Sequence, residues 1–449
     1  MKVKIVTTPE IIATHGGNLL IGELTGQTAL SKRMNILSNG VIRTVGGIST
    51  GDVVLSYIGT LCQGQSEFEA IEQFRKDPYY AESMGVKYVP SSATLRQRLD
   101  ALGESVKEQT IAIITEENCK LLKKLKIIIS PCSLGIVPLD IDVSPFDNSD
   151  TKKQGVGYTY KGFDGYAPIF AYLGEEGYCI NAELREGTQH CQKDTPEFLS
   201  QAILNAKIAT DKPILVRMDS GNDAIENIAV MQKTETQADF IVKRNPRQES
   251  LQFHWNYAMD NGVEIRNTRE GKQIYVYESE QKLKDCPQKV RVISFVTERT
   301  STAGGQILLM PEYELESYYT SLNGEIATAT DIQNLYHAHG TSEQFHSEIK
   351  TDLDLERLPS GKFNTNAIVL ALGTTAYNLL RIIGQESLKK NDYPPTAHKV
   401  NRRRIRTIID RYITLAVKFV RHARVAFVKL SEINPWFPSF RRIYAAFRQ

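Results

Sequence analysis

Apolar and polar positions alternate in different ways along the chain and divide it into five segments. Residues 1–130 show mainly helical periodicity, whereas residues 131–245 contain short apolar runs that predict strands with intervening helices. Residues 246–330 predict several antiparallel strands joined by polar turns. Residues 331–384 predict two helices, and residues 385–449 predict a linker followed by a basic helical region. The pattern therefore predicts an α/β protein with helical regions at both ends.

The segment from Tyr336 to Leu353 predicts an amphipathic helix. It contains no proline, and Phe345, Ile349 and Leu353 recur at intervals of four residues, which places them on one apolar stripe. We expect this stripe to pack on the protein core.

A second stripe of the same helix carries less ordinary chemistry. Tyr336, Glu343 and Lys350 are separated by intervals of seven residues. His339 follows the tyrosine by three residues, so a regular helix would place all four side chains on one face. A carboxylate among a phenol, an imidazole and an ammonium can hold a metal ion while its neighbours hold phosphates. The alternative is a solvated face with an ordinary ion pair.

Residues 137–144, VPLDIDVS, predict a strand with two acids on one face. Apolar side chains point one way, and Asp140 and Asp142 point the other. Such a pair is unusual on an otherwise apolar strand, because a buried carboxylate needs a partner. Either aspartate fits the role of a metal ligand, and a capped structural carboxylate is the alternative for Asp142.

A further acid follows the buried strand predicted at residues 213–218. This strand delivers Asp219 at its carboxyl end, a place where both catalytic acids and capping acids occur. Asp223 is the alternative acid in the same loop. A helix at about residues 194–207 precedes this strand, and a strand at residues 238–245 follows it.

The N-terminal region contains two helices of interest. Residues 66–85 predict one amphipathic helix that ends near a glycine. Residues 89–103, VPSSATLRQRLDALG, predict a helix that begins with serines and carries Arg96 and Arg98. Such a helix suits insertion into a DNA groove, and a surface helix with two solvated arginines is the alternative.

Charge is distributed unevenly along the 449 residues, whose net charge is +2. Residues 401–449 contain twelve Lys or Arg and two acids, a net charge of +10, so residues 1–400 sum to −8. A basic tail on a mildly acidic body indicates a polyanionic partner.

Cysteine usage and hydropathy bear on the cellular setting. The six cysteines include no Cys-x-x-Cys pair, which argues against structural zinc and a disulfide framework and fits a reducing cytosol. The first residues lack the apolar run of a signal peptide. The most apolar segment, from Ile368 onward, is interrupted by Gly373 and Asn378 and is predicted to be too short and too polar to span a bilayer. We therefore expect a soluble cytoplasmic protein with no membrane partner.

The segment around Glu343 resembles the signature of a large group of insertion-sequence DDE transposases. Their spacing is Tyr, two residues, Arg, three residues, Glu, six residues and Lys. Tyr336, Glu343 and Lys350 match it, and His339 stands where the family carries Arg. The KTDLDLERLPSG turn and the following NAIVLALGTTAYNLLR segment also look like the family's next helix.

The resemblance implies a ribonuclease H-like catalytic core formed by residues 131–245 and 331–384, which matches the predicted order of strands and helices. It implies that residues 246–330 are a β-rich insertion and that residues 1–130 are a helical DNA-binding region. Residues 385–449 become a basic helical C-terminal region.

The resemblance also implies the site. Asp142, Asp219 and Glu343 would be the catalytic acids and would hold two Mg²⁺ ions per active site, with Mn²⁺ as a substitute. The residues expected to contact DNA are Tyr336, His339, Lys350, Arg96, Arg98, Lys243, Arg402 and Arg404.

The implied function is cut-and-paste transposition. The protein would bind the terminal inverted repeats of an insertion sequence and join the cleaved ends to target DNA, as a homodimer in the nucleoid of a prokaryotic host. A metal-dependent nuclease of the same fold without strand transfer, and a non-catalytic DNA-binding derivative, remain as alternatives. His339 is the departure that bears on the derivative, because histidine is often neutral near pH 7 and lacks the guanidinium fork.

Overall fold

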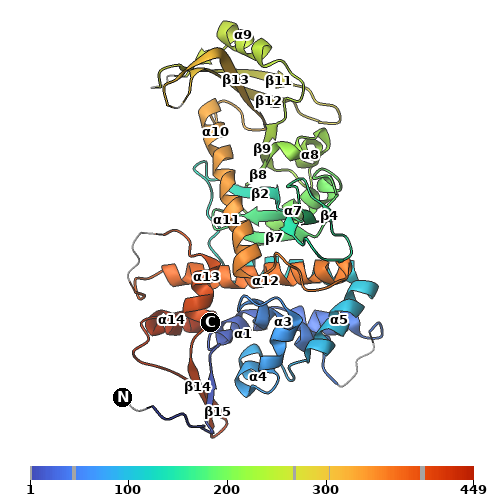
Figure 1. Cartoon of the computed structure of the whole chain (residues 1–449), viewed down its shortest axis with the longest axis vertical. Helices are drawn as coiled ribbons and strands as arrows, with labels where there is room; N and C mark the ends of the chain where they lie inside the picture. Colours follow the sequence, from blue (N-terminus) through green and yellow to red (C-terminus); the bar gives the residue numbers. More distant parts are fainter. Residues whose placement is uncertain (1–2, 43–46, 266–268, 303, 395–399, 449) are drawn as a thin grey trace.

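The computed structural model describes residues 3–42, 47–265, 269–302, 304–394 and 400–448. The molecule is elongated, with a β-rich lobe at one end, a sheet in the middle, and the N-terminal and C-terminal regions together at the other end (Figure 1). The predicted α/β class is confirmed.

Helices dominate the N-terminal region, as predicted. They are α1 (Asn18–Gly26), α2 (Leu30–Ser38), α3 (Thr50–Leu61), the 3-10 helix η1 (Phe68–Phe74), α4 (Pro78–Met84), α5 (Ser92–Ser105) and α6 (Lys107–Lys124). The single helix predicted over residues 66–85 is wrong, because the chain forms η1 and α4 there. Asp77 separates the two: its Oδ1 accepts hydrogen bonds from the backbone N–H groups of Tyr79 and Tyr80 and caps α4.

The central sheet is built around β2. Its strands are β2 (Val137–Val143), β6 (Ile169–Leu173), β7 (Tyr178–Glu183), β8 (Ile214–Met218) and β9 (Asp239–Arg244). β2 pairs with β6 antiparallel and with β8 parallel, and β8 pairs with β9 parallel. The helices α7 (Thr195–Ala209) and α8 (Ile225–Met231) connect the last strands. This order is consistent with the expected ribonuclease H-like sheet, and the strands predicted at residues 137–144, 213–218 and 238–245 are confirmed.

A smaller sheet lies beside the end of β2 that carries the aspartates. It contains β3 (Phe146–Asp147), β4 (Gly157–Tyr158) and β5 (Asp164–Tyr166), in the order β3-β5-β4.

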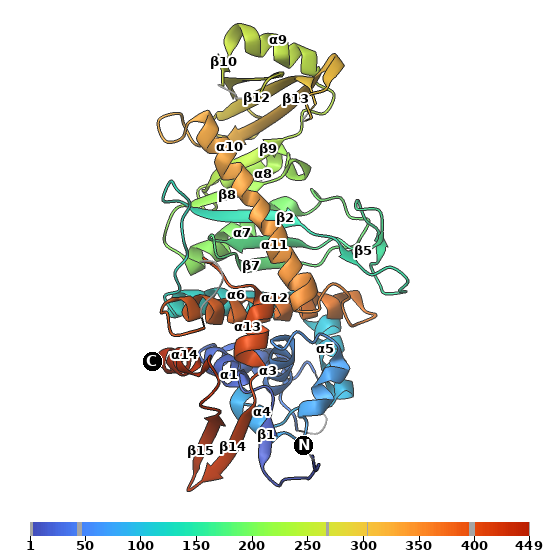
Figure 2. The same ribbon diagram turned by 60° about the vertical axis from the view of Figure 1, so that its left-hand side comes forward.

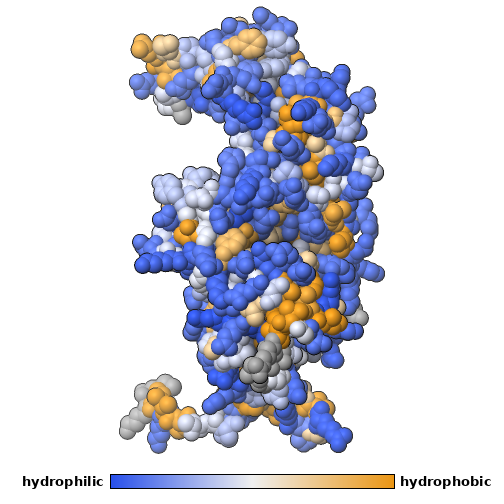
Figure 3. Space-filling view, turned by 90° about the vertical axis from the view of Figure 1, so that its right-hand side faces the viewer, coloured by the Kyte–Doolittle hydropathy of each residue, from blue (hydrophilic) through white to orange (hydrophobic). Residues whose placement is uncertain are grey.

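The segment predicted as a β-rich insertion extends the central sheet. It forms α9 (Leu251–Asn261), β10 (Val263–Glu264), β11 (Lys272–Gln281), β12 (Val290–Ser301) and β13 (Ile307–Thr320). Because β13 pairs with β9 over residues 317–320, the described residues form one continuous sheet of nine strands. This lobe stands away from the core, and the surface between them is hollowed and mainly hydrophilic (Figure 3).

A long helical rod crosses the sheet (Figures 1 and 2). It consists of α10 (Ala329–His337), the 3-10 helix η3 (Ala338–Thr341), α11 (Ser342–Ser347) and the π-helix η4 (Glu348–Asp352). Thr328 and Asp331 form a capping box at its start. The helix predicted at residues 336–353 is therefore present, but it begins earlier and contains two irregular turns.

The helix α12 (Phe363–Leu388) is the centre of the fold. It packs against β7, α3, α5 and α6. Its length and composition would allow it to cross a membrane, contrary to the prediction from sequence, but its most apolar window is completely buried. That burial is typical of the core helix of a folded domain.

The helical prediction for the C-terminal region is wrong over residues 417–430. After α13 (Ile405–Ile408) and the π-helix η5 (Ile409–Ile413), the chain forms the hairpin β14 (Val417–His422) and β15 (Val425–Leu430), then α14 (Phe437–Phe447). The hairpin is rich in β-branched and aromatic residues, and it pairs with β1 (Ile11–Ala13). Residues 395–399 of the predicted linker lie outside the described residues.

Candidate active site between the central strand and the rod

Asp142 lies near the end of β2 and faces the rod. Its Oδ2 accepts a hydrogen bond from Ser342 Oγ at 3.3 Å and lies 3.2 Å from His346 Nε2. Burial raises the pKa of this carboxyl, but the hydrogen bond and charge of His346 outweigh burial, and the pKa is lowered from its usual value. Asp142 is therefore held as a carboxylate.

His346 connects Asp142 to a buried tyrosine. Its Nδ1 lies 3.1 Å from the hydroxyl of Tyr172, which is fully buried in β6. A carboxylate can only accept, so the partners require a proton on Nε2 that His346 donates to Asp142. On the other side of the ring, Nδ1 and the Tyr172 hydroxyl form a second hydrogen bond. His346 is not among the site residues predicted from the sequence, because no spacing signal distinguishes it.

Asp219 lies beside Asp142 at the ends of two adjacent parallel strands. Ile141 of β2 is in register with Met218 of β8, so the next residue of each strand is one of these aspartates. Asp219 Oδ1 accepts a hydrogen bond from Asn222 Nδ2 at 2.8 Å. Burial and then the negative charge of Asp142 raise the pKa of Asp219. The two carboxylates therefore repel each other across the strand ends.

Asp140 is neutralised within the protein. Arg217 donates two hydrogen bonds to it, from Nε to Oδ1 at 2.6 Å and from Nη2 to Oδ2 at 2.7 Å. Both side chains are buried. The guanidinium also donates to the carbonyl of Leu335 at 2.7 Å, which ties the rod to the sheet. These bonds give Asp140 a structural role and leave Asp142 as the acid of β2 that lacks an arginine.

Asp223, the alternative to Asp219, makes a different contact. Its Oδ2 accepts a hydrogen bond from the backbone N–H of Asn245 at 2.8 Å. This bond joins two loops at the strand ends and gives Asp223 a structural partner.

The position of His339 differs from the expectation. Its side chain is buried between the rod, to which it belongs, and β2. Its Nδ1 lies 2.9 Å from Asp140 Oδ1. Burial lowers the pKa of this imidazole, but the charge and hydrogen bond of Asp140 outweigh burial and raise it. The imidazole is thus held within the protein and does not face a DNA backbone at the surface.

Glu343 is not brought together with Asp142 and Asp219. Its side chain is exposed, and within the described part of the chain it makes no hydrogen bond or ion pair. It lines a shallow depression that also contains Arg402 and Arg404. Across the same described residues, no group of three His, Cys, Asp or Glu side chains is arranged to hold a metal ion.

The 3-10 segment of the rod explains this difference. A 3-10 helix turns about 120° per residue and an α-helix about 100°. The four residues of η3 therefore add roughly 80° of rotation between Tyr336 and Glu343. Ser342 and His346 point to Asp142 instead, although a regular helix would have favoured Glu343.

Tyr336 lies near the carboxylates, and Lys243 lies over its ring and pairs with Glu316 at 3.5 Å. The Lys243 Nζ lies 5.6 Å from the centre of the Tyr336 ring. Burial, followed by the charges of Asp219 and Asp142, raises the pKa of the Tyr336 hydroxyl. This phenol therefore stays protonated and can donate a hydrogen bond near the two acids.

Lys350 lies at the other end of the site. Its Nζ donates to the carbonyl of Pro145 at 2.6 Å and lies 5.6 Å from the Phe146 ring centre. Burial lowers the pKa of this ammonium, and the charge of Asp142 is among the groups that act on it. Lys350 is therefore positioned beside Asp142 by the chain that follows β2.

Tyr160 is a further residue of the site that the sequence did not indicate. Its hydroxyl donates to the carbonyl of Val143 at 3.0 Å. Burial, and then the charges of Asp142 and Asp219, raise its pKa. Tyr160 thus brings a second protonated phenol close to the acids, from the loop between β4 and β5.

The predicted arginines of α5 differ from each other. Arg96 is half exposed and pairs with Glu69 at 2.7 Å. Arg98 is buried and donates to Thr50 Oγ1 at 2.7 Å, so it holds α5 against α3 and does not face a DNA surface. The expectation for Arg98 is therefore not met, because its guanidinium is used inside the fold.

Arg402 and Arg404 bind the rod. Arg402 stacks on Phe345 at 4.3 Å and donates to Gln344 Oε1 at 2.7 Å. Arg404 pairs with Asp352 at 2.9 Å and remains about half exposed. Both arginines therefore attach the C-terminal segment to the rod.

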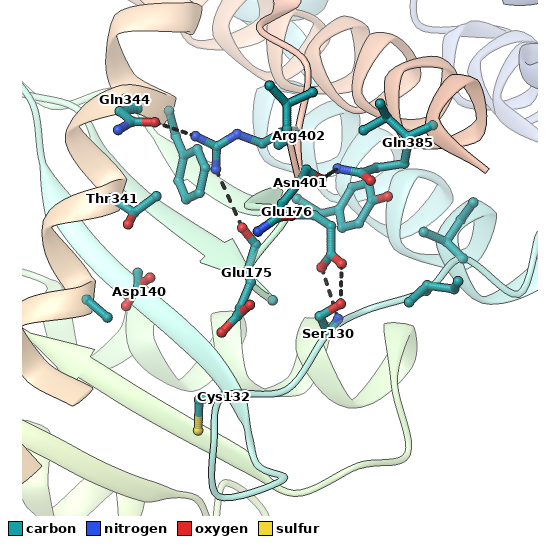
Figure 4. A pocket seen from close by; sticks show the side chains of 18 of the residues that line it. Ser130, Cys132, Asp140, Glu175, Glu176, Thr341, Gln344, Gln385, Asn401 and Arg402 are labelled. Atoms are coloured by element: carbon teal, nitrogen blue, oxygen red, sulfur yellow. Dashed lines mark hydrogen bonds between the residues drawn. The ribbon is translucent and has the colours of Figure 1, made fainter. Parts of the chain in front are cut away.

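A pocket of 1020 Å³ lies on the other side of the rod (Figure 4). Ser130 donates to Glu176, Arg402 reaches Gln344, and Glu175 lines the same space. Asp140 also lines this pocket, but its carboxylate is already bound by Arg217. The pocket is therefore distinct from the pair of free carboxylates.

Comparisons with known proteins place the chain in a family. The family model described as transposase DDE domain group 1 matches residues 1–449. A solved piggyBac transposase synaptic complex with hairpin DNA is similar at 10% identity and a TM-score of 0.42, covering 81% of this chain and 74% of that chain. No curated protein matches. Because the family model spans the whole chain, this protein belongs to the transposase DDE domain group 1 family.

Proposed function

We propose that this DDE transposase binds the terminal inverted repeats of an insertion sequence and cleaves and joins DNA strands at Asp142 and Asp219. The observation that carries the proposal is the pairing of these acids at the ends of adjacent parallel strands, where the charge of one raises the pKa of the other. Two partly buried carboxylates that repel each other without a nearby arginine indicate a site for cations.

The donor set fits divalent metal ions. Carboxylate oxygens are the hard ligands that Mg²⁺ prefers, and Mn²⁺ accepts the same ligands. A cation between Asp142 and Asp219 would relieve the repulsion that raises the pKa of Asp219. When bound, a pair of such ions lowers the pKa of water and stabilises the leaving oxygen of a phosphodiester.

Glu343 is the third ligand by family resemblance. Its side chain is exposed and makes no bond within the described residues, so no partner holds it in its present position. It follows Ser342 directly, and the hydroxyl of Ser342 already contacts Asp142. We propose that Glu343 joins the aspartates when DNA and metal ions bind.

The surrounding residues fit the handling of a phosphodiester. His346 and Ser342 orient Asp142 as an anion, so that it can accept a cation. Tyr336 and Lys350 lie near the acids, and Lys243 lies over the Tyr336 ring; one phenol and two ammonium groups suit contact with phosphate oxygens. We propose a homodimer that bridges two transposon ends, by family resemblance.

The proposal is tested with supercoiled plasmid that carries the inverted repeats flanking the coding region. We expect Mg²⁺-dependent nicking by the wild-type chain and none by Asp142→Asn or Asp219→Asn. A pre-cleaved transposon end should join to a second plasmid. Nicking without joining would favour the metal-dependent nuclease, and absence of nicking in wild type with intact DNA binding would favour the non-catalytic derivative.

The non-catalytic derivative draws its support from His339. The hydrogen bond between this histidine and Asp140 offers a structural reason for the residue. We therefore favour the active enzyme.

A further inference from the structure

The C-terminal ribbon, β14 and β15, has one packed face and one open face. Cross-strand pairing fixes which residues share a face, because directly opposed residues point the same way. The packed face contains Val417, Phe419 and Val428, which form an apolar cluster with Ala13 of β1 and Tyr79 of α4. The residues of the open face are Lys418, Val420, His422, Val425, Phe427 and Lys429.

Positive charge is concentrated along the ribbon. Residues 417–430 contain four Lys or Arg and no acid; two of the four lie on the open face, whereas Arg421 lies on the packed face and pairs with an acid of α4. Lys418 and Lys429 are directly opposed, an arrangement of like charges that destabilises a hairpin. Lys418 has an ion pair with Glu10, whereas Lys429 is exposed and has no partner among the residues described. Lys429 thus faces a like charge without a partner of its own among the described residues.

The tip of the ribbon adds another cation. Ala423 and Arg424 form its two-residue turn, with φ values of 48° and 67°. A turn with two positive φ values favours Asn and Gly, which adopt this conformation at lower cost. The Arg424 side chain is exposed and contacts no partner in the described parts of the chain. The residue at the tip is therefore a cation where backbone geometry alone would select glycine.

Apolar side chains lie among these cations. Phe427 is 45% exposed and Val425 is 51% exposed on the open face. The ribbon projects from the end of the molecule that carries the N-terminal helices, away from the central sheet (Figures 1 and 2). Its open face is accessible to a large ligand.

We propose that the C-terminal ribbon is a duplex-DNA-binding arm whose open face enters the major groove. This groove admits a two-stranded β-ribbon. Lys429 and Arg424 would neutralise phosphates, while Phe427 and Val425 would contact apolar edges such as thymine methyl groups. The inference rests on the proposed function, because it requires DNA as the partner. It assigns the ribbon to DNA beyond the cleaved end, at a distance from Asp142 and Asp219.

The first test measures how affinity for a mixed-sequence DNA duplex depends on salt. Each phosphate contact contributes about 0.9 to the slope of log K against log salt concentration. Lys429→Gln combined with Arg424→Gln should therefore reduce the slope by about two and weaken binding at moderate salt. The matched control is Lys126→Gln with Lys233→Gln, two exposed lysines outside the ribbon without a partner among the described residues, and it should leave the slope unchanged.

The second test separates DNA contact from folding. Arg424→Gly places glycine at a positive φ, so the melting temperature should stay the same or rise. Affinity for the same duplex should fall nevertheless, because a cation is lost. A purely structural ribbon would give the opposite result, with stability rising and affinity unchanged.

Two results would overturn the inference. One is an unchanged salt slope in the Lys429 and Arg424 double variant while the wild-type chain binds DNA. The other is a wild-type dimer in light scattering that the same variant converts to a monomer, because the open face would then bind a second copy of the chain. Wild-type nicking that Asp219→Asn abolishes would show that the proposed function stands even if the ribbon does not bind DNA.

Discussion

The carboxylates on the two sides of the rod have opposite surroundings. On the face towards α12, Glu348 is buried and accepts a hydrogen bond from Arg381, and the hydroxyl of Tyr377 lies 3.4 Å away. On the face towards the sheet ends, Asp142 contacts Ser342 and His346 but no arginine, and Asp219 beside it has no ion pair among the described residues. The same residue class is thus neutralised on one face and left with unbalanced charge on the other.

This difference distinguishes carboxylates with a structural role from carboxylates that can bind a cation. A buried carboxylate that an arginine binds stabilises packing only as long as its partner remains, whereas an unneutralised pair lowers stability and creates affinity for a cation. Asp140 and Asp142 repeat the contrast two residues apart on one strand, since Arg217 binds only the first. The absence of arginine therefore identifies the candidate site better than the presence of acids does.

The largest expected effect is on activity. Asp219→Asn should reduce metal-dependent strand cleavage by about a thousandfold or more, as expected for loss of a catalytic carboxylate. The melting temperature should stay the same or rise, because the substitution removes a charge that Asp142 repels. Plasmid nicking and thermal unfolding check this pair of outcomes. A large loss of stability would place Asp219 with the structural acids.

On the side of the rod towards α12, a substitution should lower stability and leave cleavage intact. Arg381→Met leaves Glu348 buried without its guanidinium and should cost about 3–5 kcal/mol of unfolding free energy. Cleavage per folded molecule should persist, because Arg381 does not contact the site. Chemical denaturation measures the loss, and adding Glu348→Gln should restore part of it. No recovery in the double variant would argue against the pairing.

Asp140→Asn tests the contrast within one strand. It leaves the buried guanidinium of Arg217 without a carboxylate, so we expect a loss of about 3 kcal/mol. Asp142→Asn should cost clearly less, since its donors can bond to an amide oxygen. Equal losses in the two variants, measured by denaturation, would remove the distinction between them.

The smallest expected effect concerns orientation. His346→Gln should weaken divalent-ion affinity by about 10- to 100-fold, because the residue that holds Asp142 is changed. Tyr172→Phe should have a lesser effect in the same direction, since it removes only the hydroxyl beyond the imidazole. Calorimetric titration with Mn²⁺ compares the variants. An effect of Tyr172→Phe larger than that of His346→Gln would contradict this order.

The sequence predicted the parts of the site that depend on local pattern. Alternation along residues 137–144 and the buried run at residues 213–218 placed Asp142 and Asp219 correctly at strand ends, because a strand has a fixed period of two. It could not decide between Asp140 and Asp142. Arg217, which makes the distinction, is far away in sequence and reaches Asp140 only through strand pairing.

The sequence predictions that the structure contradicts concern segments whose local pattern is compatible with more than one structure. Residues 417–430 have apolar positions compatible with a helix, but pairing with β1 selects strands. The rotation of Glu343 away from the acids depends on the 3-10 turn at residues 338–341, which periodicity does not reveal. His339 and Arg98 appeared to be surface residues, because their partners Asp140 and Thr50 are distant in sequence.

Titration with Mn²⁺ of the wild-type chain, Asp142→Asn and Asp219→Asn tests the central claim most directly. If the two free carboxylates form the metal site, the wild-type chain binds the ion and each variant loses at least about tenfold in affinity. Equal affinity in all three proteins would show that these acids hold no metal, and it would contradict the assignment of the active site.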